Sequence, residues 1–350
     1  AFMQDAPLSL STLAVRAGWG RQGNQAVAPY QTKLLLRADP GAVYPIGNVL
    51  TTGLRAAQVG NPDLTWETAE GINVGIDYGF MNDRFTGVID IYQKTTEDLL
   101  LEVEVPQPAV VPTRLENIGS VRNRGIEVTF NTPLISGDER TLGMELVASV
   151  ERNEVTSLGD TTQACRTDQS KCRFINTGFV SGQGQSNQYS QRIMLGEPIG
   201  TFFAPEFLRV ETTGANAGKQ IFRCRTASAA CVNGETTDPA DADRIVAGSA
   251  NPDFSVGLSN NLTWGKFDAS WLWRGEFGGK VFNNTALVYR TKSNAKQGRN
   301  FLASTLGDPD DISEPAKFST RWIEDRTFVR LQNLTVGYTF NLPSRFGGGR

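Results

Sequence analysis

Histidine is absent from the 350-residue sequence. Its absence rules out Ser-His-Asp triads and imidazole metal ligands, and it removes the commonest general base near neutral pH. The sequence also lacks any run of the roughly 18–20 apolar residues that a membrane-spanning helix requires. Helical membrane spans are therefore excluded, whereas a barrel of membrane-spanning strands is still allowed.

An excess of charge of either sign is also missing, because 34 Lys and Arg residues oppose 37 Asp and Glu residues, for a net charge of −3. This balance gives no reason to expect nucleic acid as a partner. The N-terminal AFMQDAPLSL lacks the basic region, apolar segment and small-residue cleavage site of a targeting signal. Because SLSTLAVRAGWG, which overlaps it, already alternates like a strand, we expect an interior part of a longer protein rather than a complete cytosolic one.

The four cysteines form two pairs of equal spacing, Cys165 with Cys172 and Cys224 with Cys231. Neither pair has the short CxxC spacing of zinc or redox sites, and no histidine could complete a mixed site. We predict two loop-closing disulfides in an oxidising compartment, with free thiols as the alternative. Four cysteines allow three pairings, so the sequence leaves the connectivity open.

Segments typical of strands are joined by connections of two very different lengths. Compact turns are expected at residues 81–83 (MND), at 136–139 (SGDE) and at Gly265. Long excursions are expected at residues 95–122, 153–199, 205–250 and 278–325. Alternation of short and long connections is typical of a transmembrane barrel, with turns on one side and loops on the other.

Large apolar residues alternate with small or polar ones along these strands. In GINVGIDYGF (71–80) the residues Ile72, Val74, Ile76, Tyr78 and Phe80 share one face. A soluble sandwich would turn this face inward, so alternation alone does not identify the medium. Strands of about 10 residues fit a tilted membrane span of about 9–11 residues better than the usual soluble strand of about 5–6. We therefore expect the apolar face to meet lipid.

Aromatic residues collect towards the strand ends, where interfacial girdles of a membrane barrel would place them. The residues concerned are Tyr78, Phe80, Tyr92, Trp264, Phe267, Phe277, Tyr338 and Phe340. Capping of an ordinary soluble core is the alternative. Together with the strand lengths, these positions favour an all-β, antiparallel transmembrane β-barrel.

Six segments in series resemble SusC/RagA-type TonB-linked outer-membrane receptors, and together they extend over most of the chain. They are AVRAGWGRQGNQAVAPYQT (14–32), NPDLTWETAEGINVGIDYGFMNDRFTGVIDIYQKTTEDLL (61–100), NIGSVRNRGIEVTF (117–130), LGEPIGTFFAPEF (195–207), NPDFSVGLSNNLTW (251–264) and FVRLQNLTVGYTF (328–340). The resemblance implies a partial barrel, the C-terminal strands of a large 22-stranded barrel with short periplasmic turns and long extracellular loops. Residues 1–350 would all belong to that barrel domain, with the N-terminal plug and the final strands absent from this chain.

The resemblance also implies a function. Such receptors import organic nutrients, commonly oligosaccharides or peptides, with energy passed on by TonB through the N-terminal region, and a SusD-like surface lipoprotein closes the mouth. The expected location is the outer membrane of a Gram-negative bacterium, in contact with its lipid. The alternative is a secreted soluble β-sandwich, either a carbohydrate-binding or a glycoside-hydrolase module.

Local candidates for ligand or lid contact are aromatic residues in the expected loops. Phe202 and Phe203 could stack on a sugar or pack under a loop, and Trp322 presents the same two possibilities. The polar run SGQGQSNQ (181–188) is interpreted as a flexible loop because it lacks a nucleotide-binding glycine pattern.

Acidic residues supply neither a metal motif nor a catalytic pair. DPADAD (238–243) and GDPDDISE (307–314) offer oxygen atoms to Ca²⁺, but neither matches an EF-hand loop. Scattered carboxylates such as Asp77, Asp90, Glu127, Glu145 and Glu276 are explained more simply as charges in a wet barrel interior than as a glycosidase pair. We expect no catalytic residue, no resident cofactor and no enzymatic activity.

Overall fold

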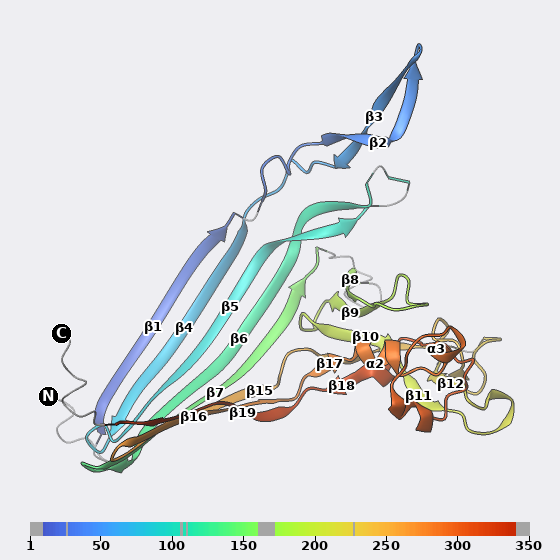
Figure 1. Ribbon diagram of the computed structural model, residues 1–350. Coiled ribbons are helices and arrows are strands. Elements are labelled where there is room, and N and C mark those ends of the chain that lie inside the picture. The colour runs from blue at the N-terminus through green and yellow to red at the C-terminus, as the bar shows by residue number, and fades with distance from the viewer. Residues whose placement is uncertain are drawn as a thin grey trace, which may run out of the picture.

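The computed structural model describes residues 10–25, 27–105, 108–109, 111–159, 172–226 and 228–340. Its main element is an antiparallel sheet of eight strands in the order β1-β4-β5-β6-β7-β15-β16-β19 (Figure 1). The strands are β1 (Leu10–Asn24), β4 (Glu67–Phe80), β5 (Phe85–Glu104), β6 (Thr113–Ser136), β7 (Arg140–Ser157), β15 (Phe254–Trp264), β16 (Phe267–Phe277) and β19 (Phe328–Tyr338). Each of these strands is paired with the one that precedes it in the sheet, which is the meander of an up-and-down barrel wall.

Hairpin turns and long connections lie at opposite ends of this sheet, as the sequence predicts (Figure 1). The turns are the short segments 81–84, 137–139 and 265–266. At the first turn, Asp83 accepts hydrogen bonds from the hydroxyls of Ser11 (2.6 Å) and Thr12 (3.0 Å), which joins the turn to β1. The predicted architecture of an antiparallel partial barrel is confirmed.

The register aligns the apolar side chains into rows that cross the whole sheet. One such row is Val15, Ile76, Ile89, Val128, Ala148, Val256, Gly275 and Val329. Ile72, Val74 and Ile76 are 53%, 43% and 40% exposed, so this face is not covered by the chain itself. The neighbouring row on the opposite face is polar and contains Arg16, Gly75, Asp90, Glu127, Ser149, Ser255 and Glu276.

The polar face is cross-linked by side chains. Arg16 of β1 donates to Asp77 of β4 (3.1 Å) and to Asp90 of β5 (2.8 Å), and so links three strands. Gly75 makes room for this link, because a Cβ atom there would lie 2.5 Å from an oxygen of Asp90 and 2.7 Å from Cζ of Arg16. Ser149 and Ser255 share a hydrogen bond of 2.7 Å farther along the row.

Most of the predicted aromatic girdle lies on the apolar face. Near the turns, the rings of Phe267 and Tyr338 are 4.6 Å apart, and those of Phe85 and Phe130 stack at 6.2 Å. Tyr92 is an exception, because its hydroxyl donates to Glu151 (3.2 Å) on the polar face. The interfacial assignment of Tyr92 is therefore wrong, and it shares the face of Asp90, two residues before it.

The strands β5 and β6 correct another expectation. A long excursion is expected at residues 95–122, but β5 has 20 residues and β6 has 24, and only residues 105–112 connect them. A membrane span needs about 9–11 residues, so both strands project well beyond the membrane at the loop end. Their extensions pack against β7 and β9 through the buried residues Val121, Val155 and Leu158.

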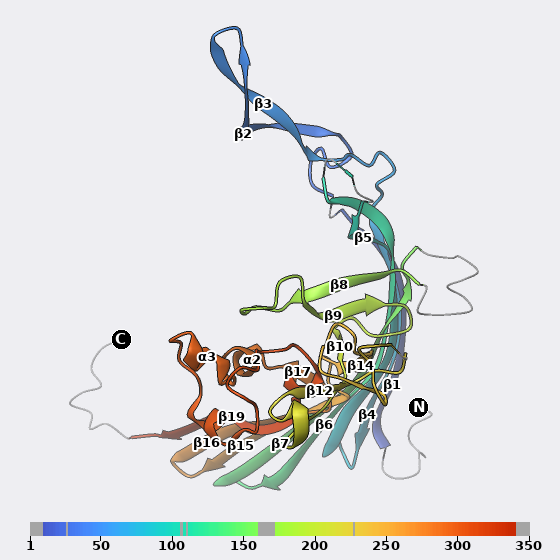
Figure 2. The ribbon, with the colours of Figure 1, turned by 90° about the vertical axis from the view of Figure 1, so that its right-hand side faces the viewer.

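The long connections fold into a second layer on the concave side of the sheet (Figure 2). The connection from β7 to β15 contains β8 (Phe174–Phe179), β9 (Tyr189–Met194), β10 (Thr201–Pro205), β11 (Phe207–Val210), β12 (Gln220–Arg223), β13 (Glu235–Thr236) and β14 (Arg244–Ser249). The connection from β16 to β19 contains β17 (Lys280–Phe282), α2 (Asn284–Tyr289), α3 (Ser293–Lys296) and β18 (Ile323–Asp325). The two connections share one core, formed by Val180, Ala204, Ala286, Leu287, Phe318 and Trp322.

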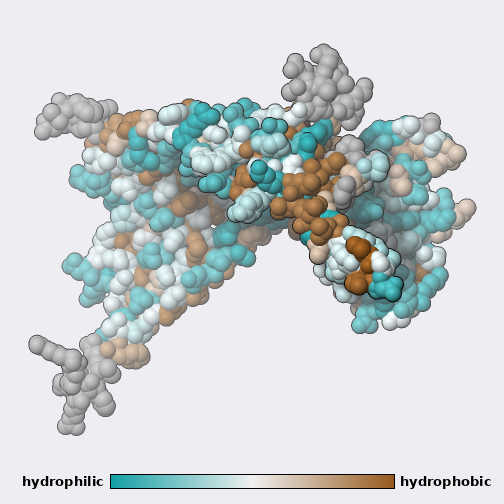
Figure 3. Space-filling model, turned by 90° about the horizontal axis from the view of Figure 1, so that it is seen from above, coloured by the Kyte–Doolittle hydropathy of each residue, from teal (hydrophilic) through white to brown (hydrophobic). Residues whose placement is uncertain are grey.

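A two-stranded hairpin, β2 (Leu35–Ile46) with β3 (Val49–Gln58), projects from the connection between β1 and β4. It stands clear of the main sheet at the loop end, and Figure 3 shows this end from above. In the described part of the chain, no helix is long and apolar enough to cross a membrane.

Candidate functional site

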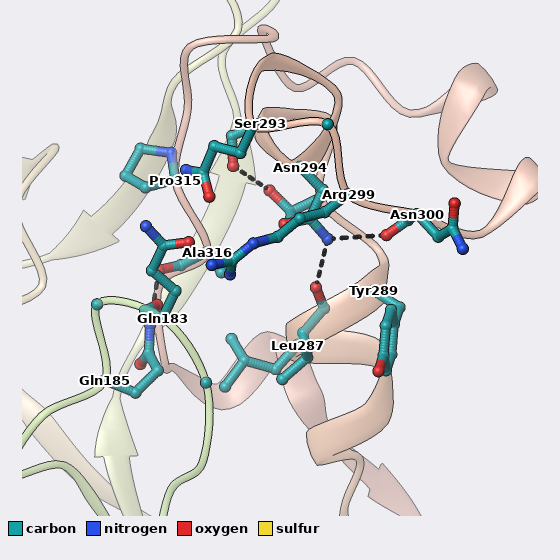
Figure 4. Close-up of a pocket in the computed structure, with 16 residues that line it drawn as sticks. Gln183, Gln185, Leu287, Tyr289, Ser293, Asn294, Arg299, Asn300, Pro315 and Ala316 are labelled. Atoms are coloured by element: carbon teal, nitrogen blue, oxygen red, sulfur yellow. Dashed lines mark hydrogen bonds between the residues drawn. The ribbon is translucent and has the colours of Figure 1, made fainter.

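A cavity of about 570 Å³ opens between the β8–β9 turn and the α2–α3 segment (Figure 4). Its walls come from three parts of the chain that are distant in sequence: residues 182–185, residues 287–300 and residues 315–316. Side-chain amides are prominent among the lining groups, namely those of Gln183, Gln185, Asn294, Gln297 and Asn300. Among the described residues, no Asp or Glu lines the cavity, and Arg299 is the one charged residue there.

Two of these amides hold the walls together. Asn294, which is 9% exposed, donates to the carbonyls of Val288 (2.8 Å) and Asn300 (3.2 Å), as Figure 4 shows. Gln185, which is 3% exposed, donates to the carbonyl of Ala316 (2.8 Å). These bonds join the β8–β9 turn to residue 316 and close the α2–α3 loop, so the cavity has a fixed polar frame.

The other amides are available to a ligand. The side chains of Gln183, Gln297 and Asn300 are exposed, and none of them is used in a hydrogen bond within the described residues. The ring of Tyr289 is 47% exposed at the same cavity. An amide both donates and accepts, so this arrangement suits hydroxyl or amide groups rather than an ion.

Two arginine–aspartate ion pairs lie beside α2, and one of them holds its C-terminal end. Arg290 makes two hydrogen bonds of 2.8 Å to Asp308, and Arg321 makes bonds of 2.7 and 2.8 Å to Asp310. The Arg290 guanidinium is the main reason that the pKa of Asp308 lies below its ordinary value. These contacts occupy carboxylates of the acidic run 307–314, and the described residues contain no cluster of three or more Cys, Asp or Glu that could hold a metal.

The predicted contact aromatics are not at this cavity. Phe202 is 4% exposed and Trp322 is 3% exposed, and the indole of Trp322 donates to the carbonyl of Lys317 (2.9 Å). Phe203 is half-buried, and the guanidinium of Arg192 lies 4.1 Å from the centre of its ring. Phe202 and Trp322 therefore pack in the interior, whereas Phe203 stacks on Arg192.

The cavity residues were missed because the polar run 181–188 was interpreted as a flexible loop. In the structure the run is a loop, as the sequence predicts, but it is anchored at two points: Gln185 is 3% exposed, and the Val180 amide at its start donates to the carbonyl of Gln188 (2.9 Å). The sequence signal for the cavity is the density of side-chain amides in SGQGQSNQ, because a linker exposed to solvent requires no particular hydrogen-bonding groups. The partner segment carries a similar signal, because NAKQGRN (294–300) has three amides in seven residues.

One predicted disulfide is confirmed, because Cys224 and Cys231 are joined and close the loop after β12. Cys172 is also disulfide-bonded. Cys165 lies outside the described residues.

Three of the lumenal carboxylates are engaged by arginines in the structure. Asp77 and Asp90 are bridged by Arg16, and Glu276, 5% exposed, contacts both Arg274 and Arg326. An acid and a base that flank a glycosidic bond need unlike environments rather than a shared cation.

The paired strands carry an apolar band on one face, tall enough to span the hydrocarbon layer, and a polar face with cross-linked side chains on the other. This combination defines the wall of a transmembrane β-barrel. Comparison with known proteins gives the family. The family described as "TonB dependent receptor-like, beta-barrel" matches residues 8–349, and the chain belongs to it. Receptors of this family are outer-membrane proteins, so the chain is part of an outer-membrane barrel and not a soluble β-sandwich.

Relatives include TonB-dependent receptor P3 of Formosa agariphila, 28% identical over 99% of this chain and 34% of that protein. The TonB-dependent receptor SusC of Bacteroides thetaiotaomicron is 26% identical over 97% of this chain and 32% of that protein. The chain thus spans about a third of the length of these curated relatives. The resemblance to SusC/RagA-type receptors is confirmed.

Solved structures share the fold over the full chain. The RagAB peptide transporter matches with a TM-score of 0.74 at 20% identity, and the RagAB peptide importer in its closed-closed state with 0.77 at 21%. Each match covers 100% of this chain and 36% of the other. At such identity the likeness shows the fold alone.

Proposed function

We propose that this chain forms part of an importer that takes up an uncharged, hydroxyl-rich oligomer, an oligosaccharide, across the outer membrane. The observation that supports this ligand class is the cavity with unused amides at Gln183, Gln297 and Asn300. Sugar hydroxyls donate and accept hydrogen bonds as amides do, and an exposed ring such as Tyr289 offers a stacking surface. No catalytic role is proposed.

A peptide is the second candidate. Side-chain amides pair equally well with peptide groups, and the solved structures of similar fold belong to a peptide transporter. Variants of the cavity amides, described below, separate an oligosaccharide from a peptide. The ligand whose affinity falls in those variants is the one that the cavity binds.

Two partners belong to this proposal. Energy would come from TonB, as the family name of the relatives states. A SusD-like lipoprotein would close the loop end, where the concave layer and the β2–β3 hairpin lie. Co-purification of such a lipoprotein with the intact receptor supports this partner, and its absence from a receptor active in uptake contradicts it.

The test of the ligand class uses the intact receptor with Gln183 and Asn300 both changed to alanine. Loss of two amide hydrogen bonds of about 1 kcal/mol each should weaken binding of a neutral oligosaccharide by roughly tenfold or more. Asn216→Ala, an exposed amide outside the cavity, is the matched control. Isothermal titration with neutral oligosaccharides and with peptides measures the effect, and unchanged affinity for every ligand that binds would overturn the assignment.

A further inference from the structure

Two arginines face each other on the lipid-facing side of the sheet. Arg124 of β6 is directly opposite Arg152 of β7, one row beyond the apolar pair Ile126 and Val150. All four residues are on the same face, because strand residues two apart point the same way. Like charges directly opposite one another are destabilising, so this pair needs an explanation.

The pair lacks adequate counter-charge within the described residues. Arg124 is exposed and forms no ion pair there. Arg152 reaches Asp253 at 3.3 Å, but their side chains are 55% and 66% exposed, so this contact is weak. One row farther from the membrane, by contrast, Arg122 is neutralised by Glu154 at 2.7 Å.

An apolar groove lies beside this pair, with Arg152 but not Arg124 among its lining residues. A hollow of about 330 Å³ on the outer face is lined by Ile126, Val128, Ala148, Val150, Arg152 and Phe254, together with residues 149, 253 and 255. Its aliphatic side chains lie within the apolar band, and Arg152 and Asp253 stand at its loop end. The groove therefore joins an apolar floor to a rim that carries Arg152 and Asp253, with Arg124 opposite Arg152 on the neighbouring strand.

The level of the rim follows from the fold. The hairpin turns are at the opposite end of β6 and β7, and in this family's barrels short turns face the periplasm and long loops the exterior. Arg124 and Arg152 are thus at the outer boundary of the membrane, where headgroups meet hydrocarbon.

We propose that Arg124 and Arg152 bind the phosphate of an outer-leaflet lipid whose acyl chain occupies the groove. Guanidinium groups match phosphate oxygens in charge and geometry, and a phosphate between the two cations removes their repulsion. The occupant is a phosphorylated membrane lipid rather than a free ion, because the groove offers a chain-sized apolar surface directly below the charges. This inference is independent of the imported ligand.

The test uses the intact receptor, purified in mild detergent and mixed with lipid A or with the same lipid after removal of its phosphates. Native mass spectrometry counts the lipid retained. The wild-type protein should retain phosphorylated lipid A at least tenfold better than the dephosphorylated form, and the double variant Arg124→Gln/Arg152→Gln should lose this preference. Arg140→Gln, at the turn-end boundary over Trp264, should retain it.

A second variant tests the groove without changing charge. Ala148→Phe fills the hollow and should lower retention of phosphorylated lipid A several-fold. Inorganic phosphate at millimolar concentration should fail to displace the lipid; displacement would assign the site to a free ion and overturn the proposal.

Equal retention of both lipid forms by the wild-type protein, or an unchanged preference for phosphorylated lipid A in the double variant, would also overturn the proposal. Heat-modifiable migration confirms that each variant is folded, and Arg124→Gln alone serves if the double variant is not.

Discussion

At the scale of the residue, a glycine on the lumenal face can be a packing requirement, as Gly75 is, or can leave open space, as Gly257 does. Gly75 leaves the space through which Arg16 reaches Asp77 and Asp90. Gly257 lies on the same face of β15, and a Cβ atom there would meet nothing within 4 Å. Two glycines in similar strands therefore have different consequences when replaced.

Gly75→Ala should destabilise the barrel wall by roughly 1–3 kcal/mol, because the added methyl group displaces Arg16 and Asp90. Gly257→Ala should change stability by less than about 1 kcal/mol. Urea or heat titration of the intact receptor, followed by heat-modifiable migration, compares the two. Equal effects would show that the Arg16 link does not constrain this position.

Val74→Arg tests which medium the apolar face meets. A charge near the bilayer midplane costs about 2–4 kcal/mol, so less of this variant should assemble in the membrane. Asn73→Arg, on the adjacent polar face, should assemble nearly normally. The folded fraction in outer-membrane preparations is the measurement, and equal assembly of the two variants would contradict a lipid-facing Val74.

At the scale of the element, the stability of α2 and the residues that follow it, up to residue 308, depends on the ionised carboxylate of Asp308. Arg290 lowers the pKa of Asp308, so this pair stabilises the folded segment above the ordinary pKa of about 4 and ceases to do so as pH falls through the lower folded value. Asp308→Asn should destabilise residues 284–308 by about 1 kcal/mol at pH 7 and by much less near pH 2.

Hydrogen exchange of the 284–308 peptides checks this prediction. Asp325→Asn is the control, because the Asp325 side chain is 76% exposed in its pair with Lys280. Faster exchange caused by Asp308→Asn that persists undiminished at low pH would point to lost packing instead of a lost charge.

The sequence allows the elements of the membrane wall to be predicted far better than those of the loop layer. Period-two alternation and turn chemistry are local signals, and they place β4, β15, β16 and β19 to within a few residues. The extensions of β5 and β6 are fixed by packing against β7 and β9, which no local pattern records. Period-two alternation puts Tyr92 on the same face as Asp90, two residues before it, so the aromatic character of Tyr92 alone does not predict its face.

The site is harder to predict for the same reason. Gln185 and Asn294 are more than a hundred residues apart, and they line one cavity because the two connections share a core around Leu287 and Trp322. A cavity of this kind depends on tertiary contacts, so the sequence shows two amide-rich runs, 181–188 and 294–300, but not that they meet.

At the scale of the whole molecule, the proposed importer couples uptake to energy from the inner membrane. Collapse of the proton-motive force in cells that express the intact receptor should abolish uptake of the ligand but leave surface binding unchanged. Parallel assays of labelled oligosaccharide bound at the cell surface and accumulated inside distinguish the two steps. Continued accumulation after uncoupling would favour passive diffusion over TonB-driven import.

The register of the sheet also sets the level of each hairpin in the membrane. Thr86, beside the first turn, is opposite Asn131, yet β6 continues to Ser136 before it turns. In the first two hairpins aromatic or aliphatic side chains begin directly at the turn, Phe80 and Phe85 in one and Ile135 in the other. Between these two hairpins the offset compensates for the tilt of the strands, of about 35–45°. The third turn follows the second without an offset, because Arg140 is opposite Trp264. A two-residue insertion in β6 would preserve its inward and outward faces, but it would lower every later hairpin towards the periplasm.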